Sequence, residues 1–317
     1  MVIRIAIPDD YQRATAQLSF LHDNPAFQCR ALGHLPDPHA SEVLATAEAL
    51  ILIRERTQID AAFLRQTPQL KLISQTGKVA RNIDLAACQR AGVAVVEGTG
   101  SPVAPAELTW LLIMASRRKL VSSVNAMAAG RWQTEIGRAV NQQTLGILGY
   151  GKIGKLIAGY ARAFNMQVQV WGSERAREEA RRDGHSVPAD RTALFATSDI
   201  LSVHLRLVDA TEASISEADL LAMKPDALFV NTSRAELVAP GALLHALGQG
   251  RPGFAALDVY EQEPVYDPAS PLLQMPNVLC TPHLGYVEQA SYEAYFRVAF
   301  DNLTRFFAGD RSQVINP

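Results

Sequence analysis

Residues 144–154 read Thr-Leu-Gly-Ile-Leu-Gly-Tyr-Gly-Lys-Ile-Gly, a short apolar strand pattern that runs directly into a glycine-rich turn. An amphipathic helix pattern follows, and a second apolar strand, Val168–Trp171, completes a β-α-β unit. The spacing Gly149-x-Gly151-x-x-Gly154 is a weak signal as a bare string, but between a strand and a helix it is typical of a dinucleotide-binding turn. The first glycine allows the tight bend, the second lets the backbone approach a pyrophosphate, and the third lets helix and strand pack closely. A glycine turn without a ligand is the alternative.

The residues after the second strand bear on which dinucleotide binds. NAD-binding units usually carry Asp or Glu there to bind the adenosine ribose, whereas this chain has Gly172. The following Ser173, Arg175 and Arg177 favour the 2′-phosphate of NADP, although Glu174 offers a displaced acceptor for the ribose of NAD. The two arginines have a plainer interpretation as the start of a solvated helix. The sequence predicts NADP or NAD as the cofactor, with a slight preference for NADP.

The rest of the chain repeats this alternation of apolar strands and helices. Its 317 residues are twice the usual domain size of about 150, so we expect two domains. Most strand patterns are continuous Val, Ile and Leu runs, as expected for parallel strands covered on both faces. The sequence therefore predicts an α/β protein with two doubly wound parallel sheets. The expected strands are Ile3–Ile7, Ala49–Ile53, Leu72–Ser74, Val93–Val96, Leu145–Leu148, Val168–Trp171, Ile200–Leu205, Ala227–Asn231, Ala255–Val259 and Val278–Thr281.

Helical patterns separate most of these strands, and two longer ones do not fit simple crossovers. We expect one continuous helix over Pro105–Ala129, stopped by Gly130 and buried on several sides because its first half is apolar almost all round. A second long helix is expected over Glu288–Ala308. The shorter expected helices are Ile59–Arg65, Leu85–Arg90, Ile153–Phe164, Ala176–Asp183, Ala218–Met223 and Pro240–Gly248.

The charge balance and the cysteines exclude several classes of protein. Lys and Arg number 30 against 32 Asp and Glu, without the basic excess typical of nucleic-acid binders. The three cysteines form no Cys-x-x-Cys pair, so we expect neither a disulfide framework nor a metal site, but a reducing, cytoplasmic setting. The longest apolar run ends at Arg117-Arg118-Lys119, so we expect no membrane span. We therefore predict no nucleic-acid and no membrane partner.

Three consecutive predicted strands end in side chains suited to redox chemistry on a hydroxyl or carbonyl carbon. Arg234 follows the first, Glu261 and Glu263 the second, and His283 the third. Ligands of open α/β sheets bind beyond the carboxyl ends of the strands. A guanidinium there can hold a carboxylate at two points, and an imidazole can accept and return a hydroxyl proton. Each residue alone also fits a surface position, and His204, at another strand end, is the main rival to His283.

The chain resembles the D-isomer-specific 2-hydroxyacid dehydrogenases over essentially its whole length. The resemblance rests on four motifs in the order and spacing of that family, which are residues 149–154, 231–234, 257–264 and 277–285. It implies that Arg234 binds the substrate carboxylate and carbonyl and that His283 is the general acid/base. It also implies that Glu263, which directly precedes a proline, is the partner of this histidine in preference to Glu261.

The resemblance further implies contacts with cofactor and substrate. Asp258 would lie near the nicotinamide carboxamide, and the loop around Gly77 would bind the substrate carboxylate through backbone N–H groups. The expected cofactor-binding residues are Gly149, Tyr150, Gly151, Lys152, Ile153, Gly154, Ser173, Arg175, His204, Thr232 and Asp258. The expected substrate-binding residues are Thr76, Gly77, Lys78, Val79, Arg234 and His283.

The family's architecture places one domain inside the other. A discontinuous, flavodoxin-like substrate domain of residues 1–98 and 283–317 would flank a Rossmann domain of residues 99–282, and the helix after Pro105 would contribute to a homodimer. The chain departs from the commonest pattern at Gly172, at Arg206 where Pro is common, and at Ala235 where Gly is frequent. The substrate loop also lacks the frequent Gly-Val-Gly-Tyr-Asp run, so the substrate is not carried over from any one member.

The predicted function is that of an NAD(P)-dependent oxidoreductase that interconverts a D-2-hydroxy acid and its 2-keto acid by hydride transfer. Glyoxylate, hydroxypyruvate or a larger 2-keto acid is the expected substrate. The alternative is a dinucleotide-sensing, corepressor-like binding protein on the same scaffold without significant turnover. A formate dehydrogenase is disfavoured because those relatives carry Gln where Glu263 stands, although the neighbouring Gln262 weakens that argument.

Overall fold

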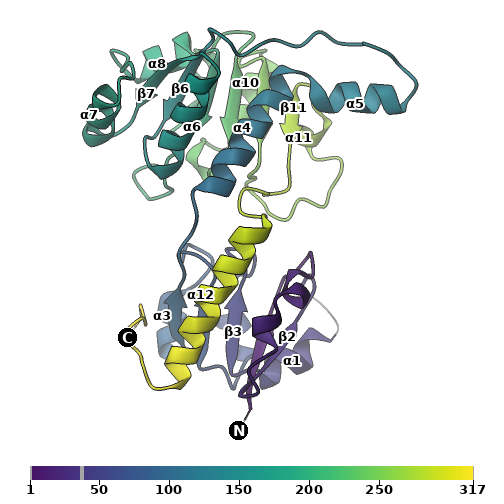
Figure 1. Cartoon of the computed structure of the whole chain (residues 1–317), viewed down its shortest axis with the longest axis vertical. Helices are drawn as coiled ribbons and strands as arrows, with labels where there is room; N and C mark the ends of the chain where they lie inside the picture. Colours follow the sequence, from purple (N-terminus) through teal and green to yellow (C-terminus); the bar gives the residue numbers. More distant parts are fainter. Residues whose placement is uncertain (1, 36–38, 317) are drawn as a thin grey trace. The chain divides into compact units, whose positions relative to one another are not determined.

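The computed structural model describes residues 2–35 and 39–316, which form two compact units. The terminal unit consists of Met1–Ser101 with Glu288–Pro317, and the middle unit consists of Pro102–Val287 (Figure 1). The middle unit thus begins at residue 102 and ends at residue 287, against the predicted 99 and 282. His283 therefore lies in the middle unit, because the segment that carries it is hydrogen-bonded to Asp258 of that unit.

The terminal unit is built on a five-stranded parallel sheet in the order β2-β1-β3-β4-β5. Its central strands are fully buried, as their continuous apolar runs predict. The strands are β1 (Ile3–Ile7), β2 (Phe27–Ala31), β3 (Ala49–Leu52), β4 (Leu72–Gln75) and β5 (Ala94–Glu97). The helices are α1 (Ala40–Thr46), α2 (Ala61–Arg65), α3 (Leu85–Arg90) and α12 (Gln289–Phe307), with short 3-10 turns at Ala14–Gln17 and Ser19–Leu21.

Helix α12 comes from the far end of the sequence and packs on this sheet (Figure 1). Its apolar face buries Phe296, Ala299 and Leu303 against β3 and β4. The Ser74 hydroxyl of β4 donates a hydrogen bond to the Ala299 carbonyl oxygen at 2.8 Å. The C-terminal helix is thus part of the terminal unit's core.

The middle unit is built on a six-stranded parallel sheet in the order β11-β10-β9-β8-β6-β7. Two apolar cores, one on each face, cover it, as in doubly wound folds. The strands are β6 (Thr144–Leu148), β7 (Gln167–Trp171), β8 (Ile200–Val203), β9 (Leu228–Asn231), β10 (Phe254–Leu257) and β11 (Val278–Cys280). The helices are α4 (Val103–Arg117), α5 (Leu120–Ala128), α6 (Lys152–Ala163), α7 (Glu174–Arg182), α8 (Arg191–Thr197), α9 (Glu217–Leu221), α10 (Ala242–Gly248) and α11 (Pro271–Gln274), with a 3-10 turn at Ala235–Leu237.

The prediction of one helix over Pro105–Ala129 is wrong, because the chain breaks between α4 and α5 at Lys119, whose φ is +53°. The cause lies outside the helix. The buried Arg117 guanidinium donates to the carbonyl oxygens of Asp226 and Asp199, at 2.9 and 2.6 Å, and ties the end of α4 to the sheet. Helix α5 then leads away from the sheet (Figure 1).

The other differences concern short or peripheral elements. Strand β2 and helices α1, α8 and α11 were not among the expected elements. Strand β2 lies at the edge of its sheet and is half-exposed, so its Phe-Gln-Cys-Arg-Ala sequence lacks the apolar run of a central strand. Within residues 2–35 and 39–316, no helix combines the length and apolar character that crossing a membrane requires.

Candidate active site

The glycine turn between β6 and α6 leaves room for a pyrophosphate. Gly149 has φ +100°, and a Cβ added there would lie 2.6 Å from the His204 carbonyl oxygen. A Cβ at Gly154 would overlap the Gly149 carbonyl oxygen, whereas a Cβ at Gly151 would meet nothing within 4 Å. The first and third glycines are thus required by packing, and the second faces open space at the N-terminus of α6. Exposed N–H groups at such a terminus suit a phosphate anion.

The three residues between these glycines differ in what their side chains do. The Tyr150 hydroxyl donates to the Asp183 carboxylate at 2.8 Å, and burial raises the pKa of this phenol above its usual range. Ile153 packs against the apolar core that α4 and α6 form with the sheet, and Lys152 is exposed at the first position of α6. The side chains of Tyr150 and Ile153 therefore hold the turn in place, which leaves their backbone atoms for a cofactor.

The end of β7 lies beside this turn. The Gly149 amide donates to the Trp171 carbonyl oxygen at 2.8 Å, and a Cβ at Gly172 would come within 3.7 Å of the Gly149 Cα. Ser173, predicted to bind the cofactor, is the N-cap of α7 and accepts a hydrogen bond from the Ala176 amide at 3.3 Å. The Arg175 side chain is 86% exposed. An adenosine ribose fits this place, because the end of the second strand is where Rossmann folds bind it.

His204 and Thr232, two further predicted cofactor residues, follow β8 and β9. The His204 Nε2 lies 2.9 Å from the Ser202 hydroxyl, and its buried Nδ1 has no hydrogen-bond partner among the described residues. Burial lowers the pKa of this imidazole to about 4. The ring is therefore neutral near pH 7 and a weak base. The Thr232 hydroxyl pairs with that of Thr109 at 2.7 Å, which links the end of β9 to α4.

His283 and Glu263 come together although 20 residues separate them. The His283 Nδ1 lies 2.6 Å from the Glu263 Oε2, and the two side chains are 21% and 33% exposed. The second carboxylate oxygen of Glu263 accepts from the Tyr260 amide at 2.9 Å, which fixes its orientation. The His283 ring packs edge-on against Tyr286, with centroids 5.2 Å apart. Because Nδ1 is engaged, Nε2 is the nitrogen left for a substrate hydroxyl. Glu261 is exposed and takes no part in this pair.

Asp258 supports the segment that carries His283. Its carboxylate is fully buried and accepts hydrogen bonds from the Thr281 hydroxyl at 2.6 Å, the Leu284 amide at 2.7 Å and the Gly285 amide at 2.8 Å. Burial raises the pKa of this carboxyl, and the three hydrogen bonds oppose the rise. Both carboxylate oxygens are thus bound to the histidine segment, a role that the sequence did not indicate.

Arg234 follows the end of β9 after Thr232 and Ser233, and β9 lies between β8 and β10 in the sheet. Asn231 shapes this turn, since its side-chain amide donates to the Arg234 carbonyl oxygen at 2.8 Å and its oxygen accepts from the Ser233 amide at 3.0 Å. The Arg234 Nη1 donates to the Ser233 carbonyl oxygen at 2.6 Å. Asn231 and Thr109 were missed as supporting residues. Asn231 belongs to the motif 231–234, so the sequence could have indicated its supporting role. No motif contains Thr109, so its role could not be predicted.

The predicted substrate loop belongs to the terminal unit and follows β4. The Thr76 hydroxyl accepts from the Arg54 amide at 3.0 Å, and the Arg54 guanidinium covers Gly77 so closely that a Cβ there would overlap it. Lys78 forms an ion pair with Glu97, whose other oxygen accepts from the Val79 amide at 3.0 Å. The Val79 N–H is therefore engaged within the chain and is not open to a carboxylate in this structure.

Comparisons with known proteins agree with the fold. Residues 110–285 match the family described as D-isomer specific 2-hydroxyacid dehydrogenase, NAD binding domain. A glyoxylate reductase of Aeropyrum pernix is 34% identical over 86% of this chain and 84% of its own length. A glyoxylate/hydroxypyruvate reductase B of Serratia proteamaculans is 33% identical over 90% of each chain.

A solved structure is similar to this chain in both sequence and fold. The phosphoglycerate oxidoreductase of Vibrio cholerae o395 is 49% identical, covers 98% of this chain and 100% of its own, and superposes with a TM-score of 0.92. The matched family covers more than half of the described residues, and the relatives match along most of their length. The chain therefore belongs to the D-isomer specific 2-hydroxyacid dehydrogenases, a family of NAD-binding oxidoreductases.

Proposed function

We propose that this enzyme interconverts a D-2-hydroxy acid and its 2-keto acid by hydride transfer, with glyoxylate, hydroxypyruvate or a larger 2-keto acid as substrate. The observation that carries the proposal is the pair of His283 and Glu263, 2.6 Å apart at the same sheet edge as the glycine turn. The names of the relatives from Aeropyrum and Serratia support the choice of small 2-keto acids.

His283 is the proposed general acid/base. In the reducing direction its Nε2 donates a proton to the carbonyl oxygen as that oxygen gains negative charge, and in the oxidising direction it takes the hydroxyl proton. Glu263 holds the ring through Nδ1, so that Nε2 keeps one orientation. When bound, the nicotinamide would supply or accept the hydride, chemistry that no side chain performs.

Arg234 is the proposed substrate anchor. Its guanidinium can bind a carboxylate with two parallel hydrogen bonds and polarise the neighbouring carbonyl. Asn231 sets the backbone that carries this side chain, through the hydrogen bond to the Arg234 carbonyl oxygen at 2.8 Å. In the terminal unit, the backbone N–H groups of Gly77 and Lys78 are proposed to bind substrate, whereas the Thr76 N–H donates to the Leu52 carbonyl oxygen at 2.9 Å and leaves its side chain for that role.

The proposed cofactor is NADP in preference to NAD. Gly172 provides no carboxylate for the ribose hydroxyls, and Ser173 and the arginines of α7 follow directly. The residues proposed to hold the pyrophosphate are those of the turn 149–154, with open space at Gly151. His204 contributes a neutral, half-buried ring beside this turn and is proposed as a cofactor neighbour, not as the acid/base.

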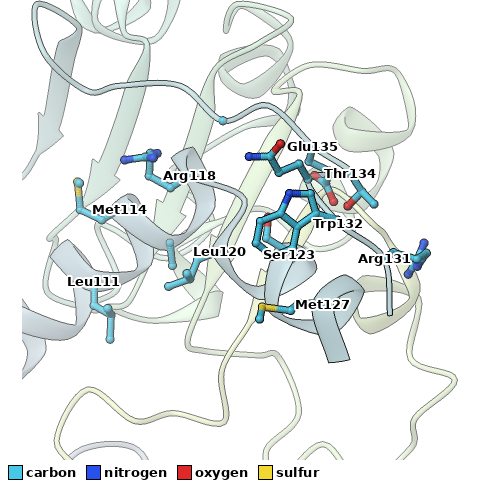
Figure 2. A pocket seen from close by; sticks show the side chains of 13 residues that line it. Leu111, Met114, Arg118, Leu120, Ser123, Met127, Arg131, Trp132, Thr134 and Glu135 are labelled. Carbon is cyan, nitrogen blue, oxygen red and sulfur yellow. The ribbon is translucent and has the colours of Figure 1, made fainter. Parts of the chain in front are cut away.

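We propose a homodimer formed through α5 and the loop after it. This segment extends from the sheet and exposes large apolar side chains, with Met127 66%, Trp132 74% and Ile136 96% exposed. Figure 2 shows Met127 and Trp132 beside a groove that Leu111 and Leu120 also line. A second copy of the chain is the proposed occupant, since contiguous apolar surface of this kind marks an interaction site. A Trp132→Glu variant is expected to sediment as a monomer, and an unchanged mass would contradict the interface.

A cytoplasmic setting is proposed as well. Cys29, Cys88 and Cys280 are free thiols, and burial raises the pKa of the Cys88 thiol to about 11, so it stays protonated and unreactive. Such thiols suit a reducing compartment.

The test is a screen of NADH and NADPH oxidation over glyoxylate, hydroxypyruvate, pyruvate, phenylpyruvate and branched 2-keto acids. We expect turnover with at least one small 2-keto acid and a faster rate with NADPH. A chain that binds the cofactor but oxidises it with no member of the panel would favour the corepressor-like alternative instead. The D-configuration of the product is checked by chiral chromatography.

A further inference from the structure

The loop that follows β4 carries two adjacent backbone N–H groups that donate to no described residue. These are the amides of Gly77, which is buried, and of Lys78. The amides on either side are engaged, Thr76 with a carbonyl oxygen at the end of β3 at 2.9 Å and Val79 with the Glu97 carboxylate at 3.0 Å. A buried N–H group is normally hydrogen-bonded. Two adjacent open donors therefore suit an anion such as the proposed substrate carboxylate.

Hydrogen bonds to the neighbouring peptide groups fix the direction of these donors. The Gly77 carbonyl oxygen accepts from the Gly98 amide at 3.0 Å. Because C=O and N–H of a trans peptide point in opposite directions, the Lys78 N–H points away from Gly98. The next peptide is held on both sides. Its carbonyl oxygen, that of Lys78, accepts from the Gln75 side-chain amide at 2.7 Å, and its N–H donates to Glu97.

Gln75 is the last residue of β4, is fully buried, and has its side chain locked in one orientation. A carbonyl oxygen can only accept, so the Gln75 nitrogen faces Lys78 and its oxygen faces the other way. That oxygen accepts from the Asn82 side-chain amide at 2.9 Å, which also donates to the Thr57 carbonyl oxygen at 3.2 Å. The Thr57 hydroxyl donates to the buried Asp9 carboxylate at 2.6 Å. A chain of buried polar groups thus supports the loop from below.

We propose that Gln75 is a positioning residue for the substrate, acting through the Lys78 carbonyl oxygen, and that Glu97 supports the same peptide from its other side. The inference rests on the proposed reaction and on the proposed binding of substrate at Gly77 and Lys78. It adds the residues that hold those donors in place. A carboxylate remote from the reacting bond is bound equally in the substrate and in the transition state. Loss of the support therefore raises KM and leaves kcat nearly unchanged.

Gln75→Glu keeps the size of the side chain but replaces the donating N–H with an oxygen. At about pH 8 the introduced carboxylate repels the Lys78 carbonyl oxygen, and we expect KM for the 2-keto acid to rise by about 10-fold, with kcat within about threefold. The KM for NADPH stays within about twofold. Gln66→Glu is the matched control and changes none of these constants, since the exposed Gln66 also donates to a backbone carbonyl, that of Ala62 at 3.5 Å.

The pH dependence of Gln75→Glu separates positioning from a general loss of structure. Burial raises the pKa of a carboxyl group, and its protonated form again donates to the Lys78 carbonyl oxygen. The KM of the variant, divided by that of the parent, should therefore fall by about fivefold between about pH 8 and about pH 5.5. Division by the parent removes the effect of the charged neighbours Asp9, Arg54, Lys78 and Glu97. A ratio that does not change with pH would overturn the proposal.

A second pair of variants tests the other side of the peptide, should thermal unfolding show that Gln75→Glu is not folded. Glu97→Ala removes the acceptor of the Val79 N–H and should raise KM by about fivefold, whereas Glu97→Gln keeps an oxygen there and should stay within about twofold of the parent. The Glu97 side chain is 23% exposed, so both changes are compatible with folding. Equal impairment of both variants would assign the effect to the lost charge and contradict the proposal.

Oxamate, a non-reducible analogue of a 2-keto acid, separates this proposal from the proposed reaction. Calorimetric titration of the enzyme with oxamate in the presence of NADPH should give a Kd about 10-fold higher in Gln75→Glu than in the parent. A parent enzyme without turnover would contradict the reaction, and the oxamate titration would still decide the role of Gln75. Equal affinities of parent and variant, or no binding to the parent, would overturn that role.

Discussion

Two histidines follow strands of the same sheet, and their surroundings give them opposite properties. His204 follows β8, is half-buried with its Nδ1 out of contact with solvent, and has its pKa lowered to about 4 by burial. His283 follows β11, keeps 21% of its side chain exposed, and has a carboxylate 2.6 Å from its Nδ1. The comparison shows that a position at a strand end does not by itself make a histidine suited to proton transfer. What distinguishes His283 is its carboxylate partner, whereas the His204 ring has only the Ser202 hydroxyl among the described residues.

The largest expected effect tests which histidine transfers the proton. His283→Ala should lower kcat for 2-keto acid reduction by about 10³-fold or more, because the alkoxide loses its proton donor. Steady-state kinetics gives kcat, and fluorescence titration with NADPH should show unchanged cofactor binding. The matched variant His204→Asn should retain kcat within about tenfold. If His204→Asn lost more kcat than His283→Ala, His204 would be the general acid/base instead.

The second prediction concerns stability and pH at His204. Its folded-state pKa of about 4 lies below the ordinary 6.5, so the unfolded chain binds a proton that the folded chain does not. The stabilisation is therefore complete above pH 6.5 and is lost as the pH falls towards 4, by about 3 kcal/mol for this one group. Thermal unfolding between pH 7 and 4 measures it.

His204→Gln should flatten part of that pH dependence. His185, whose pKa burial also lowers, should account for some of the remainder. An equally steep fall of stability in the His204→Gln variant would show that the ring is not protonated on unfolding as described.

A smaller effect tests the partner of His283. Glu263→Gln keeps the size of the side chain but removes its charge, and we expect kcat to fall by about 10- to 100-fold. The KM for NADPH should stay within about twofold, because Glu263 lies at the histidine and not at the glycine turn. Glu261→Gln is the control two residues away and should behave as the parent enzyme. Equal losses in both variants would mean that the charge acts at long range and not through the 2.6 Å contact.

The smallest expected effect concerns the hydrogen bond of the buried ring. Ser202→Ala removes the hydroxyl that lies 2.9 Å from the His204 Nε2 and should destabilise the fold by about 1 kcal/mol. Turnover should be unaffected, since this ring is not the proposed acid/base. Urea unfolding measures the first quantity and the standard assay the second. A large loss of turnover with intact stability would give His204 a closer role in the reaction.

Local sequence patterns predicted most of the fold because they reflect local requirements. Interior strands such as β3 and β10 are apolar throughout because both faces of their sheets are covered, and the glycine turn is recognised by the spacing of its glycines. Strand β2 was missed because an edge strand carries no such run. The break at Lys119 was missed because its cause, the bonds of Arg117 to Asp226 and Asp199, joins residues far apart in the sequence.

The sequence by itself determined the chemical groups available to this protein and their order along parallel strands. That order already placed Arg234, the two glutamates and His283 at one sheet edge, because parallel strands bring their carboxyl ends together. Only the tertiary structure decided that Glu263 pairs with His283, that the His204 Nδ1 is buried and that Arg177 stacks on Trp171. The physical reason is that burial, charge pairing and stacking depend on neighbours in space. Such neighbours are absent from any local pattern in the chain.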